Sequence, residues 1–415
     1  MNELLAFSNL ADIIIRSLNY IDSRLTGHNS RVTYKMMLLL DNVSFPEPEI
    51  YKILWTVLFH DIGLLRFSGE TDEIFEKENS TSFSHAIYGA LFMEHVSPFP
   101  EYAELIRYHH SSVPEIDSAD MSPQLKWVTK CLRLLDEADL YCIRHPDMPG
   151  AEVLSHLDTA AYDSEIIKVV LPALKKAERT DSLYIHQTLL EHLSQIKTTP
   201  AIQEALLWTL IRMINLRSPY TSLHCAVMVK ISDSLASFCN LGDAECFAVH
   251  MGALLHDIGK IAIPSYILDS PGTLSPEDWS IMKSHVAITE ALLKGCVSDK
   301  ILQIAIRHHE RLDGTGYPRG LSKAQLTFPQ RIVAVADITS ALFEKRSYKE
   351  AFSLEQSLQI LKNLCKERKI CPYVADIFFR HAEDIYSAAL HTSEATRALY
   401  HTLTEQYNSC ISQEE

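Results

Sequence analysis

Apolar residues recur every three or four positions over several stretches of the chain, and this spacing predicts amphipathic helices. The clearest stretch is 201–214, which reads AIQEALLWTLIRMI. The same spacing occurs at 286–294, 300–307 and 354–364. No alternating, strand-like run of comparable length is present in the sequence. The pattern therefore predicts an all-α fold.

Glycine and proline are scarce and fall between the apolar stretches. The 415 residues include 13 glycines and 17 prolines, and so few helix breakers favour helices over turn-rich β-sandwiches. The clusters that do occur, at 217–220, 270–272 and 313–318, are expected to be loops.

The length of the chain predicts more than one domain. Segment 150–200 carries no motif, and we interpret it as the closing helices of a first domain followed by a helical connector. A boundary just before Pro200 gives domains over residues 1–198 and 199–415. The polar tail from Thr404 is expected to fray.

Charge and composition narrow the classes of function. With 38 Lys and Arg against 53 Asp and Glu, the net charge of −15 argues against a broad DNA- or RNA-binding face. A small anion in a local pocket remains compatible with it. No apolar run has the length of a membrane span, and the N-terminus lacks a basic, cleavable leader. Nine cysteines, none in a CxxC pair, fit a reducing compartment. We therefore expect a cytoplasmic protein without a membrane partner.

Histidine reveals a diverged duplication. His-Asp occurs only at 60–61 and 256–257, and His-His occurs only at 109–110 and 308–309. A further histidine stands 32 positions before each His-Asp pair. An aspartate that follows an arginine by six positions closes each copy, after Arg133 in the first and after Arg331 in the second.

The order histidine, His-Asp, histidine, His-His, aspartate thus occurs twice, about 200 residues apart. The first copy consists of His28, His60, Asp61, His85, His109, His110 and Asp139, with His95 as a second candidate for the third position. The second copy consists of His224, His256, Asp257, His285, His308, His309 and Asp337.

This set of residues suits a two-metal hydrolase. A His-Asp pair on a helix supplies one terminal ligand and one carboxylate that can bridge two ions, and a His-His pair at a helix end adds two imidazoles. Lys260, one helical turn after His256, is expected to point the same way and to neutralise a phosphate oxygen. The mixed ligands favour Fe, Mn, Zn or Ni over Mg or Ca, and the lack of thiolates argues against a structural zinc site.

Residues 224–349 resemble the bacterial HD-GYP family of cyclic dinucleotide phosphodiesterases. The matching motifs are HDIGK at 256–260, HHERLDGTGYP at 308–318 and RIVAVAD at 331–337. The first half resembles a generic phosphohydrolase domain of the HD superfamily. The resemblance implies two tandem all-α HD-type domains, a buried metal centre, and hydrolysis of cyclic di-GMP or 3′,3′-cyclic GMP-AMP to a linear 5′-phosphorylated dinucleotide.

The resemblance also implies roles for residues of the second half. Two divalent ions, of Fe, Mn or Ni, are expected, with the catalytic Asp257 bridging them and a bridging water as the nucleophile. The first ion would take His224, His256, Asp257 and Asp337, and the second His285, His308 and His309. The implied substrate-side residues are Lys260, Arg311, Asp313, Gly314, Tyr317, Arg346 and Lys349. Among them, Lys260 would bind the scissile phosphate, whereas Arg311 and Asp313 would order the loop.

Three positions depart from the family pattern. Tyr220 stands where some members carry a glutamate that adds a third metal, so two ions are expected. Ser340 replaces the usual aspartate three residues after the last ligand, and Ser347 replaces the proline of Arg-Pro-Tyr. These changes concern the ligand pocket, and they leave open which cyclic dinucleotide is preferred.

The first copy departs further. Leu64 occupies the lysine position, and Ser111-Ser112-Val113-Pro114 follows His110 where the GYP loop would be. Its ligand order is nevertheless complete, so we favour a retained metal site over a regulatory or dimerising relic. A 5′-nucleotidase acting on the linear product is the activity considered for it, and a homodimer is the assembly considered for the chain.

The leading hypothesis is a metal-dependent cyclic dinucleotide phosphodiesterase. A receptor that binds a cyclic dinucleotide and signals through protein contacts is the alternative. The complete ligand set and Lys260 favour the enzyme, because a pure sensor has no need of them. A nucleotidase specific for mononucleotides is a third interpretation, and the GYP loop argues against it in the second half.

Overall fold

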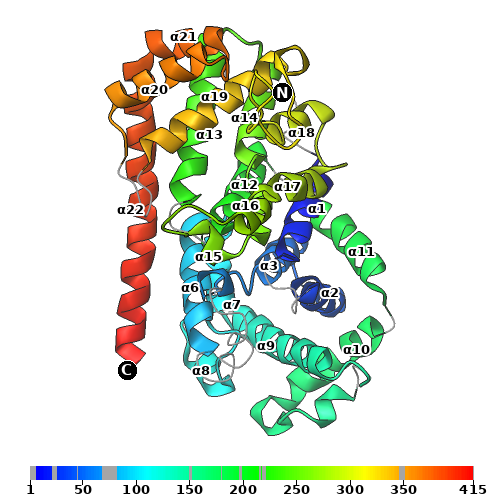
Figure 1. Ribbon diagram of the computed structural model, residues 1–415. Helices are drawn as coiled ribbons and strands as arrows, with labels where there is room; N and C mark the ends of the chain where they lie inside the picture. The colour runs from blue at the N-terminus through cyan, green and yellow to red at the C-terminus, as the bar shows by residue number, and fades with distance from the viewer. Residues whose placement is uncertain are drawn as a thin grey trace. The chain divides into compact units, whose positions relative to one another are not determined.

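The computed structural model describes residues 6–20, 26–43, 45–67, 82–148, 152–178, 180–195, 199–214, 216, 221–344 and 351–414. Within these ranges the regular elements are helices (Figure 1), and the β-type pairing is a single isolated bridge between Asp313 and Ser322. The predicted all-α fold is confirmed. None of the helices in these ranges combines the length and apolarity that a bilayer crossing requires.

The chain divides into two compact units. One consists of Met1–Leu210 with Leu403–Glu415, and the other of Ile211–Thr402. Two helices, α12 (Pro200–Ile214) and α22 (Ala382–Glu414), therefore contribute residues to both units. The domains expected over 1–198 and 199–415 remain a prediction about which segments fold as independent bodies.

The first unit is organised around α2, which packs on α3, α9, α10 and α11 and buries nearly all of its side chains. Its elements are α1 (Phe7–Leu18), α2 (His28–Leu40), α3 (Glu47–Leu58), α4 (Leu64–Phe67), α6 (Ser82–Val96), η2 (Pro100–Tyr102), α7 (Ala103–Arg107), α8 (Val113–Ser118), α9 (Pro123–Arg144), η3 (Val153–Ser155), η4 (Thr159–Ala161), α10 (Ser164–Ala177) and α11 (Ser182–Ser194). Helix α9 begins at a strong start signal, because the Ser122 hydroxyl accepts the N–H of Leu125 at 3.2 Å and Pro123 occupies the first turn.

The second unit is organised around α13, which packs on α14 and α19. Its elements are α13 (Thr221–Phe238), α14 (Asp243–Leu255), η6 (Ile258–Ala262), α15 (Ser265–Leu268), α16 (Pro276–Lys283), α17 (His285–Leu293), α18 (Asp299–Ala305), η7 (Lys323–Gln325), α19 (Phe328–Phe343), α20 (Leu354–Lys366) and α21 (Pro372–Arg380). Helix α19 starts with a capping box, in which Thr327 and Gln330 satisfy each other's backbone N–H groups. This fixes where the helix begins, and with it the position of Asp337.

The internal architecture of the two units repeats. In the first, α2 packs on α3 and α9, and in the second, α13 packs on α14 and α19. The short turn after α3 or α14 then contacts the next long helix, through α4 on α6 and through η6 on α17. The duplication that the histidines indicate is therefore a duplication of helical packing.

The glycine of each His-Asp-Ile-Gly motif allows a close backbone approach. A Cβ atom on Gly63 would lie 2.0 Å from the carbonyl oxygen of His85, and one on Gly259 would lie 2.0 Å from that of His285. Any side chain at these positions would separate the His-Asp segment from the helix that carries the next histidine.

The His-Asp pairs lie at helix ends rather than within helices. Helix α14 ends at Leu255, and Asp257 precedes the 3₁₀ segment η6. In the first unit α3 ends at Leu58, two residues before His60. The expectation of a His-Asp pair inside an α-helix is therefore wrong, although the tighter 3₁₀ turn still brings Lys260 beside Asp257.

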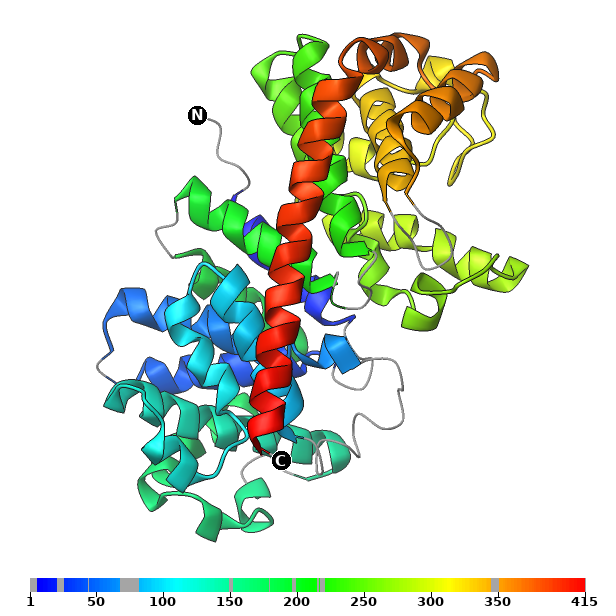
Figure 2. The ribbon, with the colours of Figure 1, turned by 90° about the vertical axis from the view of Figure 1, so that its left-hand side faces the viewer.

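The C-terminal tail is helical, contrary to the expectation that it frays. Helix α22 runs without interruption to Glu414 (Figure 2). Its end packs within the first unit, where Leu403 is fully buried, Tyr407 contacts the ring of Tyr88, and Gln406 accepts a hydrogen bond from His95 at 2.7 Å. Side-chain packing outweighs the polar composition on which the prediction rested.

Two candidate metal centres

All seven ligand candidates of the second copy meet in one cluster. They come from the start of α13, the turn after α14, the start of α17, the turn after α18 and the middle of α19. In this order they are His224, His256 and Asp257, His285, His308 and His309, and Asp337. Most are buried, and the most exposed side chain, that of His309, is 20% exposed. The fold thus converts a dispersed sequence pattern into one enclosed group of imidazoles and carboxylates.

Asp257 lies at the centre of this cluster, with its two oxygens facing different histidines. Oδ2 lies 3.0 Å from Nε2 of His256 and 3.9 Å from Nε2 of His224. Oδ1 lies 3.4 Å from Nε2 of His285 and 3.9 Å from Nε2 of His308. A carboxylate so placed can bridge two cations, one on each side.

Asp337 forms a second link across the cluster. Its Oδ1 lies 3.2 Å from Nε2 of His224, and its Oδ2 lies 3.2 Å from Nδ1 of His309. Two groups of ligand atoms each fall within 4.8 Å of one another, one from His224, His256 and Asp257 and the other from His285, His308 and His309. Each of the two groups could therefore hold a metal ion.

Backbone carbonyls set the tautomer of three of these histidines. Nδ1 of His256 donates to the carbonyl of Ala253 at 2.7 Å, Nδ1 of His308 to that of Ala305 at 2.6 Å, and Nδ1 of His285 to that of Met282 at 2.6 Å. Because a carbonyl can only accept, the proton of each ring is on Nδ1 and the lone pair of Nε2 points into the cluster. This is the tautomer in which a histidine ligates a metal through Nε2.

The environment of His285, His308 and Asp257 also favours the charge states that a metal requires. At His224 burial would lower the pKa, but Glu344 and Asp337 outweigh it and raise that pKa to about 9. Burial lowers the pKa of His285 to about 3, and burial together with His309 holds the pKa of His308 well below its usual range. Burial alone would raise the pKa of Asp257, but His256 and Lys260 outweigh it and keep that pKa well below normal. Neutral imidazoles beside an ionised carboxylate are the protonation states of a metal site.

Several buried ligand atoms have no hydrogen-bond partner within the described residues. They include Nε2 of His256 and Oδ1 of Asp257 in the second unit, and Nε2 of His109 in the first. A buried, unpaired polar atom is costly, so each needs a partner such as an ion or a water molecule. These orphaned acceptors point at the centres of the clusters, and the residues present therefore fit divalent cations.

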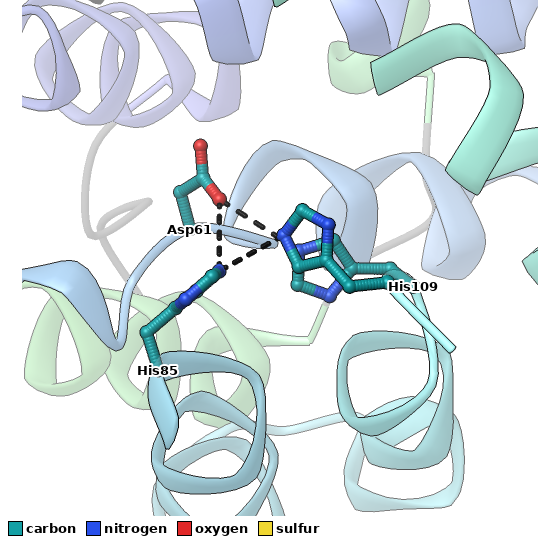
Figure 3. A group of neighbouring side chains, drawn as sticks. Asp61, His85 and His109 are labelled. Atoms are coloured by element: carbon teal, nitrogen blue, oxygen red, sulfur yellow. Dashed lines mark hydrogen bonds and ion pairs between the residues drawn. The ribbon is translucent and has the colours of Figure 1, made fainter. Parts of the chain in front are cut away.

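Six of the seven candidates of the first copy form an equivalent cluster. Oδ2 of Asp61 lies 3.4 Å from Nε2 of His28 and 3.4 Å from Nε2 of His60. Oδ1 lies 3.8 Å from Nε2 of both His85 and His109, and the three side chains point toward one another (Figure 3). Asp61 thus has the same two-sided environment as Asp257.

The seventh candidate, Asp139, does not face the cluster, and Asp136 takes the expected place. Oδ1 of Asp136 lies 2.9 Å from Nε2 of His28, and its Oδ2 lies 3.7 Å from Nδ1 of His110. These contacts match those of Asp337 with His224 and His309. The counterpart of Asp337 is therefore Asp136, three residues before the predicted Asp139.

Asp139 lies one turn further along α9, behind the ring of His28. Its Oδ2 accepts from Nδ1 of His28 at 2.8 Å, and its charge is balanced by Lys35 and by Arg31 at 2.9 Å. Burial alone would lower the pKa of His28, but Asp136 and Asp139 outweigh it and raise that pKa to about 10. Asp139 thus orients a ligand candidate and is not itself one. His95, the alternative third histidine, also lies outside the cluster.

A pocket of about 890 Å³ opens onto the second cluster. Its walls include His224, His285, His309 and Asp337, together with Lys260, Tyr317, Trp279, Met282 and Glu344. Nζ of Lys260 lies 2.6 Å from Oδ2 of Asp257, so the only lysine of the motif faces the cluster as expected. The volume is in the range of small-molecule sites.

The predicted substrate-side residues separate into two groups. Lys260 and Tyr317 line the pocket, and the ring of Tyr317 lies 4.6 Å from that of His309. The side chains of Arg311 and Asp313 instead bond within the loop, Arg311 to the carbonyl of Glu310 at 3.2 Å and Asp313 to the N–H of Thr315 at 3.0 Å. Arg346 and Lys349, like Tyr220, lie outside the described residues.

Glycine and a buried glutamate shape the loop between α18 and α19. Gly314 has a φ of +83°, and a Cβ on Gly316 would lie 2.4 Å from the backbone nitrogen of Arg311. Buried Glu310 accepts the N–H groups of Arg319 and Leu321, each at 2.8 Å. Gly314 therefore serves the loop conformation that places Tyr317.

Some residues of the two centres were not found from the sequence. Asp136 follows Lys130 by six positions, whereas Asp139 follows Arg133, so the arginine-to-aspartate interval points to Asp139 and not to Asp136. Trp279 and Glu344 lie outside the HD and GYP motifs, and nothing in their local sequence signals a pocket wall.

Leu64, the counterpart of Lys260, is buried against Leu140.

The all-helical fold and the two histidine–aspartate clusters define a protein with a candidate metal centre in each half. Two family models match, both described as HD domain, over residues 26–143 and 209–372. The chain therefore contains two HD domains, one in each half. The expectation of two tandem HD-type domains is confirmed.

The relatives of the chain include named phosphodiesterases. It is 23% identical over 401 residues to 3′3′-cGAMP-specific phosphodiesterase 1 of Vibrio cholerae, covering 92% of this chain and 93% of that one. It is 37% identical over 184 residues to the cyclic di-GMP phosphodiesterase response regulator RpfG of Xanthomonas campestris, covering 43% of this chain and 48% of that one. A crystal structure of a cyclic GMP-AMP-specific phosphodiesterase of V. cholerae shares the fold, with a TM-score of 0.54, 20% identity, and coverage of 93% and 97%.

Proposed function

We propose that the second HD domain is a metal-dependent phosphodiesterase that opens a cyclic dinucleotide, 3′,3′-cyclic GMP-AMP or cyclic di-GMP, to a linear 5′-phosphorylated dinucleotide. The observation that carries the proposal is the position of Asp257, whose two oxygens face two separate groups of imidazoles, members of which line an 890 Å³ pocket. Two relatives are named as a 3′3′-cGAMP-specific phosphodiesterase and a cyclic di-GMP phosphodiesterase, and these names support the same reaction.

The residues of the cluster would hold two ions, of Fe, Mn or Ni. His224, His256 and Asp337 would serve one ion, His285, His308 and His309 the other, and Asp257 both. Such a pair of cations supplies an activated water and neutralises charge on the phosphate, as phosphodiester hydrolysis requires. A mixed nitrogen and oxygen ligand set favours transition metals over Mg.

The pocket residues would orient the substrate. Lys260, already held against Asp257, is placed to neutralise a non-bridging oxygen of the scissile phosphate. Burial, with Asp337 and Asp257 nearby, raises the pKa of Tyr317 beyond its usual range, so its hydroxyl keeps its proton and can donate to the substrate. Both contacts act where negative charge accumulates in the transition state.

The direct test is product analysis on the full-length protein loaded with Mn or Fe. Incubation with each cyclic dinucleotide, followed by chromatography, is expected to yield the linear 5′-phosphorylated dinucleotide from at least one of them. Elemental analysis of the same sample shows whether metal is bound. Metal-loaded protein that binds either ligand tightly by calorimetry, yet releases no product, would contradict the enzyme and indicate a receptor.

Trp279 is expected to contribute to substrate binding through stacking. Its ring lies 6.1 Å from that of Tyr317 across the pocket wall, and 45% of the residue is exposed. Base stacking on an aromatic side chain contributes about 1–3 kcal/mol, so Trp279→Ala should raise KM about tenfold while kcat changes little. Steady-state kinetics measure both constants. Tyr266→Ala, at an exposed ring that does not line the pocket, is the matched control. An unchanged KM for Trp279→Ala removes this role.

For the first HD domain we propose a phosphomonoesterase acting on the linear product, a 5′-nucleotidase. Its cluster keeps the two-sided carboxylate Asp61, and Asp136 in place of the predicted Asp139 completes the set. It lacks both the lysine and the Tyr-containing loop that line the second pocket, so a cyclic substrate is not expected there.

A further inference from the structure

His224 depends on side chains for its orientation, unlike His256, His285 and His308 of the same centre. His256, His285 and His308 each follow a helix end, where the carbonyls of the last turn are free to accept their Nδ1 protons. His224 instead lies in the first turn of α13, and its counterpart His28 begins α2. At the start of a helix the carbonyls are used by the helix itself, so Nδ1 needs another acceptor.

The first centre shows what that acceptor is. Nδ1 of His28 donates to Asp139 at 2.8 Å, and Asp139 stands three residues after Asp136 on α9. The corresponding position of the second centre, three residues after Asp337 on α19, is Ser340. Its hydroxyl donates to the carbonyl of Asp337 at 2.9 Å and lies 3.2 Å from Nδ1 of His224. A neutral oxygen thus occupies the place of a carboxylate.

Glu344 restores the missing charge from a different position. It is the first residue after α19, its side chain is only 3% exposed, and its Oε2 lies 3.4 Å from Nδ1 of His224. It also lines the pocket beside Asp337. Its other oxygen has no hydrogen-bond partner within the described residues, which leaves no competing contact there to explain its burial.

We propose that Glu344 is a positioning residue for the second metal centre, which replaces the carboxylate lost at position 340 and holds His224 with its proton on Nδ1 and its Nε2 directed at the metal. The inference rests on the proposed metal centre. A carboxylate behind a ligating histidine raises its basicity and fixes its ring, and loss of such a partner typically costs 10- to 100-fold in metal affinity. The internal duplication supplies the comparison: the same imidazole has a carboxylate behind it in both halves, from α9 in one and from the residue after α19 in the other.

The test measures metal affinity directly and does not depend on turnover. The full-length protein carrying His60→Ala and Asp61→Ala, so that the first centre cannot bind, is freed of metal by chelation and titrated with Mn²⁺ against a chromophoric chelator. Glu344→Ala in this background is expected to weaken Mn²⁺ binding about 10- to 100-fold. Adding Ser340→Asp, which returns the carboxylate to its position in the first half, is expected to restore most of the affinity.

Controls separate positioning from loss of structure. Asp233→Asn removes a carboxylate that lies 3.1 Å from His250, away from the pocket, and should leave Mn²⁺ binding unchanged. If Glu344→Ala unfolds, as judged by circular dichroism, the isosteric Glu344→Gln replaces it and should weaken binding in the same direction.

The outcomes are distinguishable. Failure of the parent protein to bind Mn²⁺ overturns the proposed function itself. Binding by the parent with equal affinity in folded Glu344→Ala or Glu344→Gln overturns the positioning role alone, as does a Ser340→Asp variant that folds but restores nothing.

Discussion

Asp257→Asn is expected to abolish cleavage of cyclic dinucleotides, lowering kcat/KM by at least about a thousandfold, because the variant loses the charge that both cation positions share. The substitution is isosteric, and Asp257 contacts four imidazoles and Lys260 in a buried site. Metal content by elemental analysis should fall together with turnover. A loss of activity with full metal content would instead indicate a role confined to the substrate.

The matched control is Asp61→Asn, the same change at the equivalent position of the first half. It should leave diester cleavage by the second domain intact, since Asp61 contacts only residues of its own cluster among the ion pairs described. Circular dichroism on both variants tests whether the helices persist. Substantial cleavage by metal-loaded Asp257→Asn would contradict the bridging role on which the mechanism depends.

The second large effect is expected in the first half. His60→Ala combined with Asp61→Ala should eliminate the release of inorganic phosphate from a 5′-phosphorylated dinucleotide, because both residues belong to the buried cluster of imidazoles and carboxylates that could hold metal ions. Phosphate is measured with a colorimetric assay on the linear substrate supplied directly, so that the first reaction is not required.

The Asp257→Asn variant is the control here, because its first domain is unaltered and should still release phosphate from the linear substrate. Phosphate release that is the same in the double variant and in the unmodified protein would remove the first domain from the reaction. Metal analysis of Asp257→Asn then reports on the first centre alone. If that centre holds no metal, the result would favour the alternative that the first domain is a regulatory relic.

The sequence predicted the helical fold and the meeting of the two sets of histidines for a physical reason. Ligand order is preserved along the chain, and four of the seven positions per copy lie in His-Asp and His-His pairs that few other arrangements explain. The helical spacing at 201–214 and 354–364 likewise matches α12 and α20. Local pattern was sufficient for the positions that these adjacent pairs mark.

The sequence was insufficient where two residues on one helix could fill the same role. Asp136 and Asp139 are three apart on α9, and residues at that spacing share a helix face, so only the position of His28 decides which faces the cluster and which lies behind the ring. Trp279 and Glu344 reach the pocket from α16 and from the residue after α19, and that convergence is a property of tertiary packing.

The glycine contact beneath each His-Asp pair has a consequence for metal choice. Because Gly63 and Gly259 lie close against the carbonyls of His85 and His285, main-chain atoms set the distance between the aspartate of each His-Asp pair and the next histidine. Changes among the side chains around either cluster can alter which metal binds best. They cannot widen the distance between the aspartate and the next histidine to suit a much larger ion. Both halves are therefore expected to draw on cations of similar radius, even though their pockets have diverged.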